Sequence, residues 1–423
     1  MAVPVPDPTE WIGAVDRRTW THDGTGCEID GLTWLDMWFT IQARGEPYLD
    51  PPADPDDDNA YRWIDLTDDY IQATWVTATR STFDGSFAPG NASIVLSNKD
   101  FQYTVFTDPK VAFAIGQPVR ICALNNLVEF RGVIRGITTV DAHGRQNTIT
   151  LLLGSPLSRA AKTNRIAVSP VGASELSGDR IHRILDSIGW PTSKRVIDPG
   201  VETLQATTLE GSALSEMQLV AVSEGGAILE DRDGNVVFYD RDTVEALKTP
   251  SSWVFEASGY TSLTPLFTQI PYVSATVTVD EGDIVNDATI TAVGGTPQHD
   301  DDTDSQDLYG IVTAIREDLL NEDDSWPAEL ATLLVTERAY PRYRFAVQLG
   351  SSEAAVTPAI DIIWKVLSAR VGMATRLNQS QDPGVDTVLA SISGITHTIT
   401  PKRVTAPRTD TWTVTVETDP EYL

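Results

Sequence analysis

The sequence is poor in the residues that carry most metal and redox chemistry. It holds two cysteines, Cys27 and Cys122, and five histidines among 423 residues. The cysteines are far apart, and neither lies in a Cys-x-x-Cys motif or beside a histidine cluster, so no metal site or redox motif is expected. One disulfide is formally open, but two reduced thiols in a reducing cytoplasm is the interpretation we favour.

Long apolar stretches are also missing. No run approaches the roughly eighteen apolar residues of a membrane-spanning helix, so we expect no membrane insertion. The opening residues, MAVPVPDPTEW, contain neither a basic segment nor an apolar core, so no secretion signal is expected. Synthesis in the cytoplasm fits both absences. A hydrophobic content of 41% still allows real cores, and the length suggests about two to three domains.

Basic residues are the third shortage. Lys and Arg number 31 against 60 Asp and Glu, which gives a formal net charge of −29. Without a basic patch, the chain is not expected to bind nucleic acid by neutralising phosphates. An acidic surface suits a channel through which nucleic acid slides without sticking, and solubility alone explains it equally well. The acidity fits either a GC-rich genome or a high-salt host.

Catalytic motifs are absent as well. The sequence contains no His-Glu-x-x-His, no Gly-x-Ser-x-Gly and no peptidase-like Cys–His pairing. His182 is expected on the outer side of a helix, and His397, in a Thr-His-Thr strand, is expected to be structural. Carboxylates are so common that no pair stands out as a glycosidase acid and nucleophile. We therefore predict a protein that is not an enzyme, with no catalytic, cofactor-binding or metal-binding residues.

Calcium is the one ligand that the acidic clusters suggest. Residues 231–235 (DRDGN) begin like an EF-hand loop, but Val236 stands where that loop needs glycine, and no Glu follows at position twelve. A hairpin turn explains this segment better. The clusters at 54–58 and 300–304 could hold a hard cation loosely, although solvated, mutually repelling loops are the interpretation we favour.

Short strands dominate residues 71–153. The apolar, β-branched run Ala92–Leu96 stops at Ser97-Asn98, which are turn-forming residues. Strands at Val119–Leu124 and Leu127–Phe130 flank Asn125-Asn126, a two-residue hairpin turn. Several short strands at this spacing predict a small antiparallel barrel or sandwich.

The order of these segments resembles the first barrel of minor tail proteins, the tail-tip or baseplate hub proteins of long-tailed phages of actinobacteria. In that family, a strand ending in L-x-N-x-D is followed by G-x-P-V-R-I and then by F-x-G-x-I. The matching residues here are Leu96, Asn98 and Asp100, then Gly116, Pro118, Val119, Arg120 and Ile121, and finally Phe130, Gly132 and Ile134. Residues 101–108 lack the Arg and Pro-Asn that the family usually carries.

Residues 166–245 change to a helical pattern. Ser177 can cap a helix with Ile181, Ile184, Leu185 and Ile188 on one face, and Gly189 can end it. A second helix is expected from Ser212 to Gly225, followed by a hairpin across 231–235. This arrangement is similar to the small αβ insert of the tail hub family.

The C-terminal part returns to strands. We expect strands at 273–279 and 288–293, a flexible acidic loop at 294–307 and a helix at 327–339 capped by Ser325. In the family, I-x-H-x-I followed by a Trp closes a second barrel. Here Ile395, His397, Ile399 and Trp412 stand at the matching places.

The predicted fold is therefore mainly β with an α+β insert, with two β-barrel-like hub domains and a small helix-hairpin domain. The expected divisions are a Trp-rich packing or interface segment at 1–64, the first barrel at 65–165, the αβ insert at 166–245 and the second barrel at 246–423. The apolar knot Trp34–Phe39 in the first segment is expected to pack on the main body or on a neighbouring subunit.

The resemblance implies a structural virion protein of the tail tip that is made in the host cytoplasm. In such hubs, three copies form a pseudo-sixfold ring that joins the tail tube to the distal tip and forms part of the DNA channel. The implied partners are the tail tube or distal tail protein, the tape measure protein and other tail-tip proteins, with genomic DNA only in transit. The alternative is a carbohydrate-binding or receptor-binding β-sandwich surface protein with Trp11, Trp20 and Trp63 as sugar platforms.

Overall fold

A computed structural model describes most of the chain. The described residues are 39–47, 61–80, 87–99, 103, 113–123, 127–141, 147–164, 174–247, 253–257, 268–350, 374–378, 388–402 and 409–420. The predicted knot at Trp34–Trp38 and the acidic cluster at 54–58 lie outside them. Within the described residues, no helix is both long and apolar enough to cross a membrane.

The first half of the main sheet is an antiparallel ladder in the order β3-β4-β7-β6-β5-β1-β2. Its strands are β1 (Phe39–Pro47), β2 (Tyr61–Asp65), β3 (Tyr70–Arg80), β4 (Phe87–Ser97), β5 (Pro118–Ala123), β6 (Leu127–Val140) and β7 (Thr148–Gly154). Alternation in β4 buries Ala92, Ile94 and Leu96 on one face, as the sequence period predicts. The predicted pairing of 119–124 with 127–130 is confirmed as the β5–β6 hairpin.

The second half is assembled from strands far apart in the sequence. They are β13 (Trp253–Ala257), β14 (Thr268–Tyr272), β15 (Ser274–Val279), β19 (Tyr343–Gly350), β20 (Ala374–Asn378), β21 (Val388–Lys402) and β22 (Thr409–Pro420). β21 is the centre of this half, because it pairs with both β20 and β22. β22 continues to β19 and β15, and β20 continues to β13 and β14.

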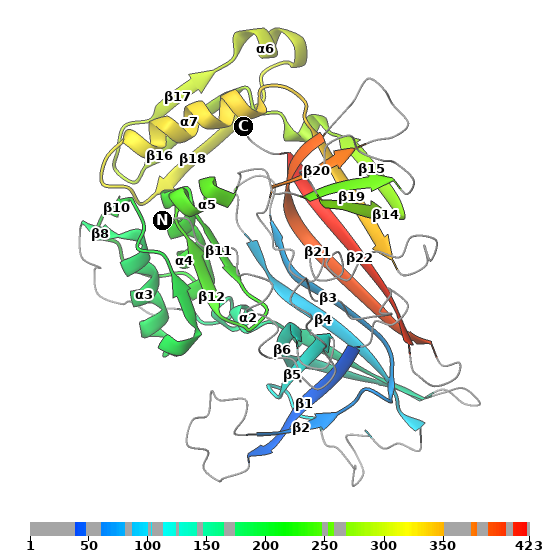
Figure 1. The fold of residues 1–423 in the computed structure, drawn as a ribbon. Helices are drawn as coiled ribbons and strands as arrows, with labels where there is room; N and C mark the ends of the chain where they lie inside the picture. The colour runs from blue at the N-terminus through cyan, green and yellow to red at the C-terminus, as the bar shows by residue number, and fades with distance from the viewer. Residues whose placement is uncertain are drawn as a thin grey trace, which may run out of the picture.

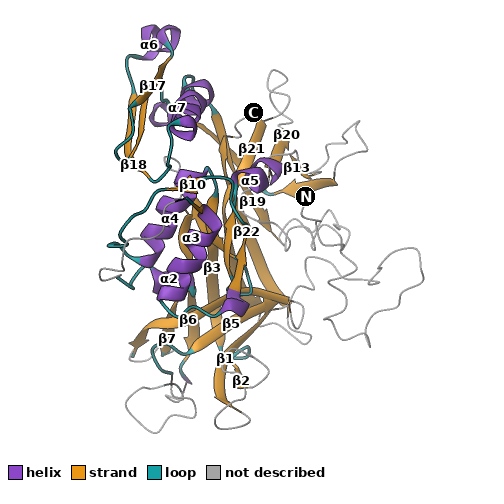
Figure 2. Cartoon of the chain, turned by 90° about the vertical axis from the view of Figure 1, so that its left-hand side faces the viewer, coloured by secondary structure: helices purple, strands orange, loops and turns teal. Residues whose placement is uncertain are grey.

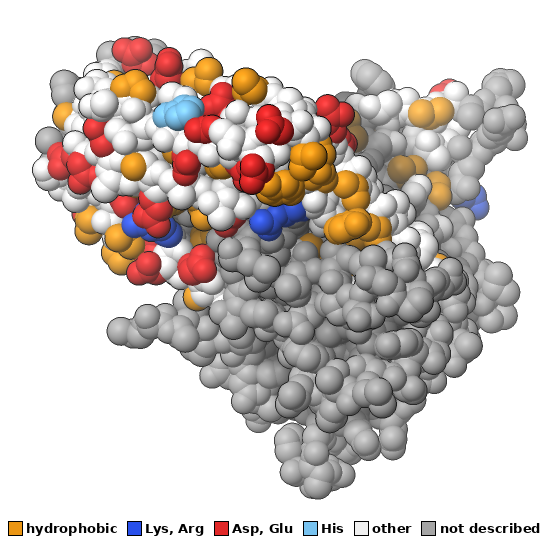
Figure 3. Space-filling model, turned by 90° about the horizontal axis from the view of Figure 1, so that it is seen from above, with side chains coloured by type: hydrophobic (Ala, Val, Ile, Leu, Met, Phe, Trp, Pro, Cys, Tyr) orange, Lys and Arg blue, Asp and Glu red, His pale blue; other side chains and the backbone are white. Residues whose placement is uncertain are grey.

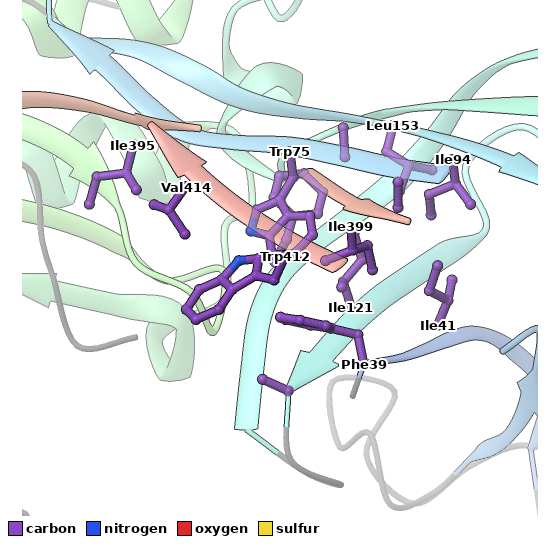
Figure 4. Packing of buried hydrophobic residues seen from close by; sticks show 14 of the residues in the cluster. Phe39, Ile41, Trp75, Ile94, Ile121, Leu153, Ile395, Ile399, Trp412 and Val414 are labelled. Carbon is purple, nitrogen blue, oxygen red and sulfur yellow. The ribbon is translucent and has the colours of Figure 1, made fainter. Parts of the chain in front are cut away.

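The two halves are joined where β3 pairs antiparallel with β21, so they form one 14-stranded sheet (Figure 1). Figure 4 shows the core beside this joint, where Phe39, Trp75 and Trp412 lie near Ile399 and Val414. The mainly β class is confirmed. Among the described strands, the ladder runs from β14 and β15 to β2 without closing into a barrel.

A separate αβ unit follows the short helix α2 (Leu157–Ala160) and lies beside the first half of the sheet (Figure 1). It comprises β8 (Glu175–Leu176), α3 (Ser177–Ser187), a 3-10 turn (Thr192–Lys194), β9 (Arg195–Ile197), β10 (Thr203–Leu204), α4 (Ala213–Glu224), β11 (Ala227–Glu230), β12 (Val236–Tyr239) and α5 (Arg241–Leu247). Both predicted helices and the hairpin are present. The unit has its own core, distinct from the core of the main sheet.

The caps of α4 match the sequence prediction, whereas the N-terminal cap of α3 differs from it. Ser212 caps α4 by accepting the Ser215 N–H, and Gly225 ends the helix in the left-handed region at φ 74°. Ser177 does not cap α3, because Leu176 occupies that position and the fully buried Ser177 hydroxyl donates to Glu224 instead. The Ser177 hydroxyl therefore bonds to the buried Glu224 carboxylate and not to a backbone N–H of its own helix.

A third unit interrupts the second half of the sheet. It contains a 3-10 turn (Glu281–Asp283), β16 (Asp287–Ala292), β17 (Gln298–Asp301), α6 (Thr303–Tyr309), β18 (Thr313–Leu319) and α7 (Ser325–Arg338). The strands form a sheet of order β17-β16-β18, and α7 covers one face while the other faces outward (Figure 2). Residues 287–292, predicted to belong to the second barrel, are therefore the centre of a separate sheet.

The predicted flexible loop at 294–307 is wrong, because this segment forms β17 and α6. Asp302 caps α6 by accepting the Ser305 N–H, and Asp287 and Asp301 stand opposite each other in the ladder. The aspartates that suggested a solvated loop therefore act partly as a helix cap and edge residues. α7 matches the predicted helix, but its cap position is Asp324 rather than Ser325.

Candidate functional site

The described histidines occupy three different environments. His182 lies exposed on α3, as predicted, and His299 lies on the exposed edge strand β17. His397 is buried in β21. Cys122 is a buried free thiol whose pKa is raised to about 11, chiefly by burial, so it is a poor nucleophile near neutral pH. Cys27, His22 and His143 lie outside the described residues.

His397 lies between two tryptophans at the joint of the two sheet halves. Its ring stacks on Trp75 at a centroid distance of 4.8 Å and on Trp412 at 5.9 Å. Nε1 of Trp412 donates to Nδ1 of His397 at 3.2 Å, so this nitrogen carries no proton. Burial, helped by the charge of Arg232, holds the pKa of His397 well below its usual value. The ring is a neutral structural element, in line with the prediction for this residue.

The only described group resembling a catalytic arrangement lies on the open face of the third unit. Asp287 accepts from the Thr313 hydroxyl at 2.7 Å and lies 2.9 Å from Nε2 of His299. The aspartate therefore stands between the other two groups. In a hydrolase triad the histidine must stand between nucleophile and carboxylate, so this order does not activate the threonine.

Acidic clusters do not form a metal centre in the described part of the chain. No group of three or more His, Cys, Asp or Glu side chains is placed to hold an ion there. Both oxygens of Asp231 accept from Asn235, one from its backbone N–H at 2.8 Å and one from its side-chain amide at 2.7 Å. This satisfies the carboxylate locally, as expected of the predicted hairpin turn.

A group of buried charges lies where the αβ unit meets the first half of the sheet. Oε1 of Glu129 in β6 lies 3.2 Å from Nη1 of Arg232, in the turn between β11 and β12. Oε2 of Glu230 in β11 accepts the Leu157 N–H at 3.3 Å. Burial raises the pKa of Glu129 to about 7, against the opposing charge of Arg232, and that of Glu230 to about 8. We refer to these four residues as the acid junction.

A β-bulge places Glu129 inside. Phe130 pairs with Ile121 and Val128 pairs with Cys122, so Glu129 is the extra residue on β6. Bulges redirect a side chain out of the regular alternation. Sequence reasoning missed both buried glutamates, and no local signal marks them in a chain with 60 acidic residues.

A second polar contact joins the αβ unit to the third unit. Glu224, fully buried at the end of α4, accepts from the Ser177 hydroxyl at 2.7 Å and from the backbone N–H groups of Val201 and Glu202. Asn321 bridges the units by donating to Glu202 at 3.1 Å and to the Ser223 carbonyl at 2.9 Å. The hydrogen bonds of Asn321 join the αβ unit to the third unit.

Negative charge predominates on the face formed by the third unit. Figure 3 shows Asp and Glu side chains spread over the face formed by the third unit, with Lys and Arg confined to a few places. Trp63, the only proposed sugar platform in the described part, carries the guanidinium of Arg120 at 4.0 Å from its ring centre.

Comparison with known proteins identifies the fold. No protein-family model and no curated protein matches the sequence. A tail protein from Neisseria meningitidis MC58 matches with a TM-score of 0.54 at 9% identity, covering 91% of this chain and 98% of that one. The 43 kDa tail protein of prophage MuSo2 from Shewanella oneidensis matches with a TM-score of 0.55 at 12% identity, covering 90% and 98%. The predicted resemblance to phage tail proteins is therefore confirmed at the level of fold.

Proposed function

We propose that this chain is a structural virion protein of a phage tail, placed at the tail tip. The observation that carries the proposal is the shared fold with two phage tail proteins over nearly the whole of each chain.

The finer proposal is a trimeric hub with pseudo-sixfold symmetry. One chain carries two β halves joined edge to edge by β3 and β21, so three copies supply six such halves. A ring of six halves can stack under a sixfold tail tube, hold the tape measure protein and form part of the DNA channel. The net charge of −29 suits a lumen that does not retain DNA.

Electron microscopy of the purified protein, with its mass in solution measured in parallel, tests this proposal. We expect a three-copy ring with a central opening, six peripheral lobes and an acidic channel wall. A ring with a basic or neutral channel would contradict the DNA-passage role. A monomer that binds sugars on a glycan array would support the receptor-binding alternative, since a hub should give no signal there.

A further inference from the structure

The acid junction contains two buried carboxyl groups, each with one oxygen that lacks a hydrogen-bond partner among the described residues. Glu129 is 1% exposed and Glu230 is 4% exposed. Within the described residues, Oε2 of Glu129 and Oε1 of Glu230 have no hydrogen-bond partner. Burying an ionised carboxylate with an unpaired oxygen is far less favourable than burying a protonated carboxyl.

The charged groups near the two carboxyls lie on β5, on β6 and in the β11–β12 turn. Arg131 on β6 packs near Gly234, and Arg120 and Arg131 both act on Cys122 beside Glu129. The β11–β12 turn contributes Arg232, which also acts on His397 of β21, together with Asp231 and Asp233. Around Glu230, the start of α2 offers only the neutral Ser155 and the Leu157 N–H. Among the residues that the structure describes, Glu129 therefore has a paired cation and Glu230 has none.

Strand β11 contacts β3 and β4 through side chains that are not part of the core of the αβ unit. Ala227 and Leu229 of β11 pack on the core of the main sheet, and Nε2 of Gln218 donates to the Phe87 carbonyl at 3.1 Å. The core of the αβ unit itself is a different cluster. That cluster also includes Leu157 and Ala160 of α2, so β11 can separate from β3 and β4 without exposing this core when α2 moves with it.

We propose that the acid junction is a pH-dependent contact, in which the αβ unit is held against β3 and β4 while Glu129 and Glu230 carry protons and is released when both carboxyls ionise. The proposal is independent of the tail-tip function, since it rests on the contacts of one chain. Ionisation leaves Glu230 as a buried anion without a cation, and movement of β11 into water relieves that cost. Glu129 adds a smaller effect because Arg232 compensates its charge.

The direction of the pH dependence follows from the raised pKa values. Both carboxyls bind protons more tightly when the junction is closed than in water, where Glu titrates near 4.5. The closed state is therefore fully favoured below about pH 4.5 and loses this advantage as the pH rises to about 8. Between pH 6 and 9, linkage predicts a loss of about 100-fold from Glu230 and about 10-fold from Glu129 in the closing equilibrium.

Hydrogen exchange of the full chain, followed by mass spectrometry at pH 6, 7.5 and 9 and corrected for the chemical exchange rate, tests the proposal. We expect the protection of peptides covering 227–239 to fall steeply with pH, while peptides covering 287–319 in the third unit change little. E230Q should leave only about a 10-fold fall, and the E129Q/E230Q double variant should show none. D233N, which removes an exposed acid of the same turn, should behave like the wild type.

Constant protection of 227–239 in the wild type across this pH range would overturn the proposal. The proposal would also be overturned if the protection of 227–239 fell with pH as much in the E129Q/E230Q variant as in the wild type. The wild-type series needs no substitution, so it remains decisive even if a variant does not fold.

Discussion

Two joints of opposite chemistry can be compared: one connects the two halves of the main sheet, and the other connects this sheet to the αβ unit. Where β3 meets β21, backbone hydrogen bonds and a stack of Trp75, His397 and Trp412 join the two halves. Where β6 meets the αβ unit, buried carboxyls and one arginine make the contact. Both joints connect segments far apart in the sequence, and both contain a buried titratable group.

The two joints differ in the pH range over which they weaken, because one buries a base and the other buries two acids. Burial disfavours the charged form in both cases, so it lowers the pKa of a base and raises the pKa of an acid. His397 is consequently neutral at ordinary pH, and the β3–β21 joint weakens only when acid protonates it. Glu129 and Glu230 titrate near neutrality, so the acid junction weakens as the pH rises.

Trp412→Ala should have the largest effect on this comparison. The side chain is fully buried, stacks near His397 and lies 5.7 Å from the ring centre of Phe39. Its removal should lower the free energy of unfolding by about 3–5 kcal/mol, measured by urea denaturation. Tyr343→Ala is the control, because Tyr343 is 49% exposed and its loss should cost less than about 0.5 kcal/mol. Equal losses would mean that the stack is not the main connection between the halves.

Arg232→Met should separate the acid junction from the aromatic joint. Without its cation, ionised Glu129 becomes an unpaired buried charge, which costs about 3 kcal/mol at pH 9. At pH 6 the carboxyl is protonated and the cost should be much smaller. Urea denaturation at the two pH values measures this difference, and E129Q added to the variant should abolish it. A cost that is equal at both pH values would show that Arg232 acts through packing alone.

His397→Gln should change the pH dependence of stability by the smallest amount. This dependence runs opposite to that of the acid junction, because the wild-type β3–β21 joint loses stability as the pH falls. The folded pKa of His397 lies below that of the unfolded chain, so the wild type gains stability above about pH 6.5 and loses it as the pH falls. Between pH 6.5 and 5, this loss amounts to at most about 2 kcal/mol. The variant should lose correspondingly less than the wild type over that range in urea denaturation. Identical pH profiles would contradict the assignment of a neutral, titratable ring at the joint.

Local patterns predicted much of this fold correctly. Apolar alternation located the β4 strand and the β5–β6 hairpin, and helical spacing located α3, α4 and α7. The acidic segment 294–307 was predicted wrongly, because capping by Asp302 and strand pairing of Asp301 depend on neighbours that local composition does not describe. The buried glutamates were missed for the same reason, since a one-residue bulge decides which way Glu129 points.

The β class, the order of most elements, the lack of catalytic motifs and the strong negative charge could all be predicted from the amino-acid sequence. These properties follow from residue type and spacing, which act over a few residues or through sums over the chain. Three features became evident only in the tertiary structure. Strand β16 belongs to a separate sheet, His397 lies between two tryptophans, and Glu129 pairs with Arg232. Each of these depends on pairing between distant segments, where burial rather than local propensity sets the energy of the contact.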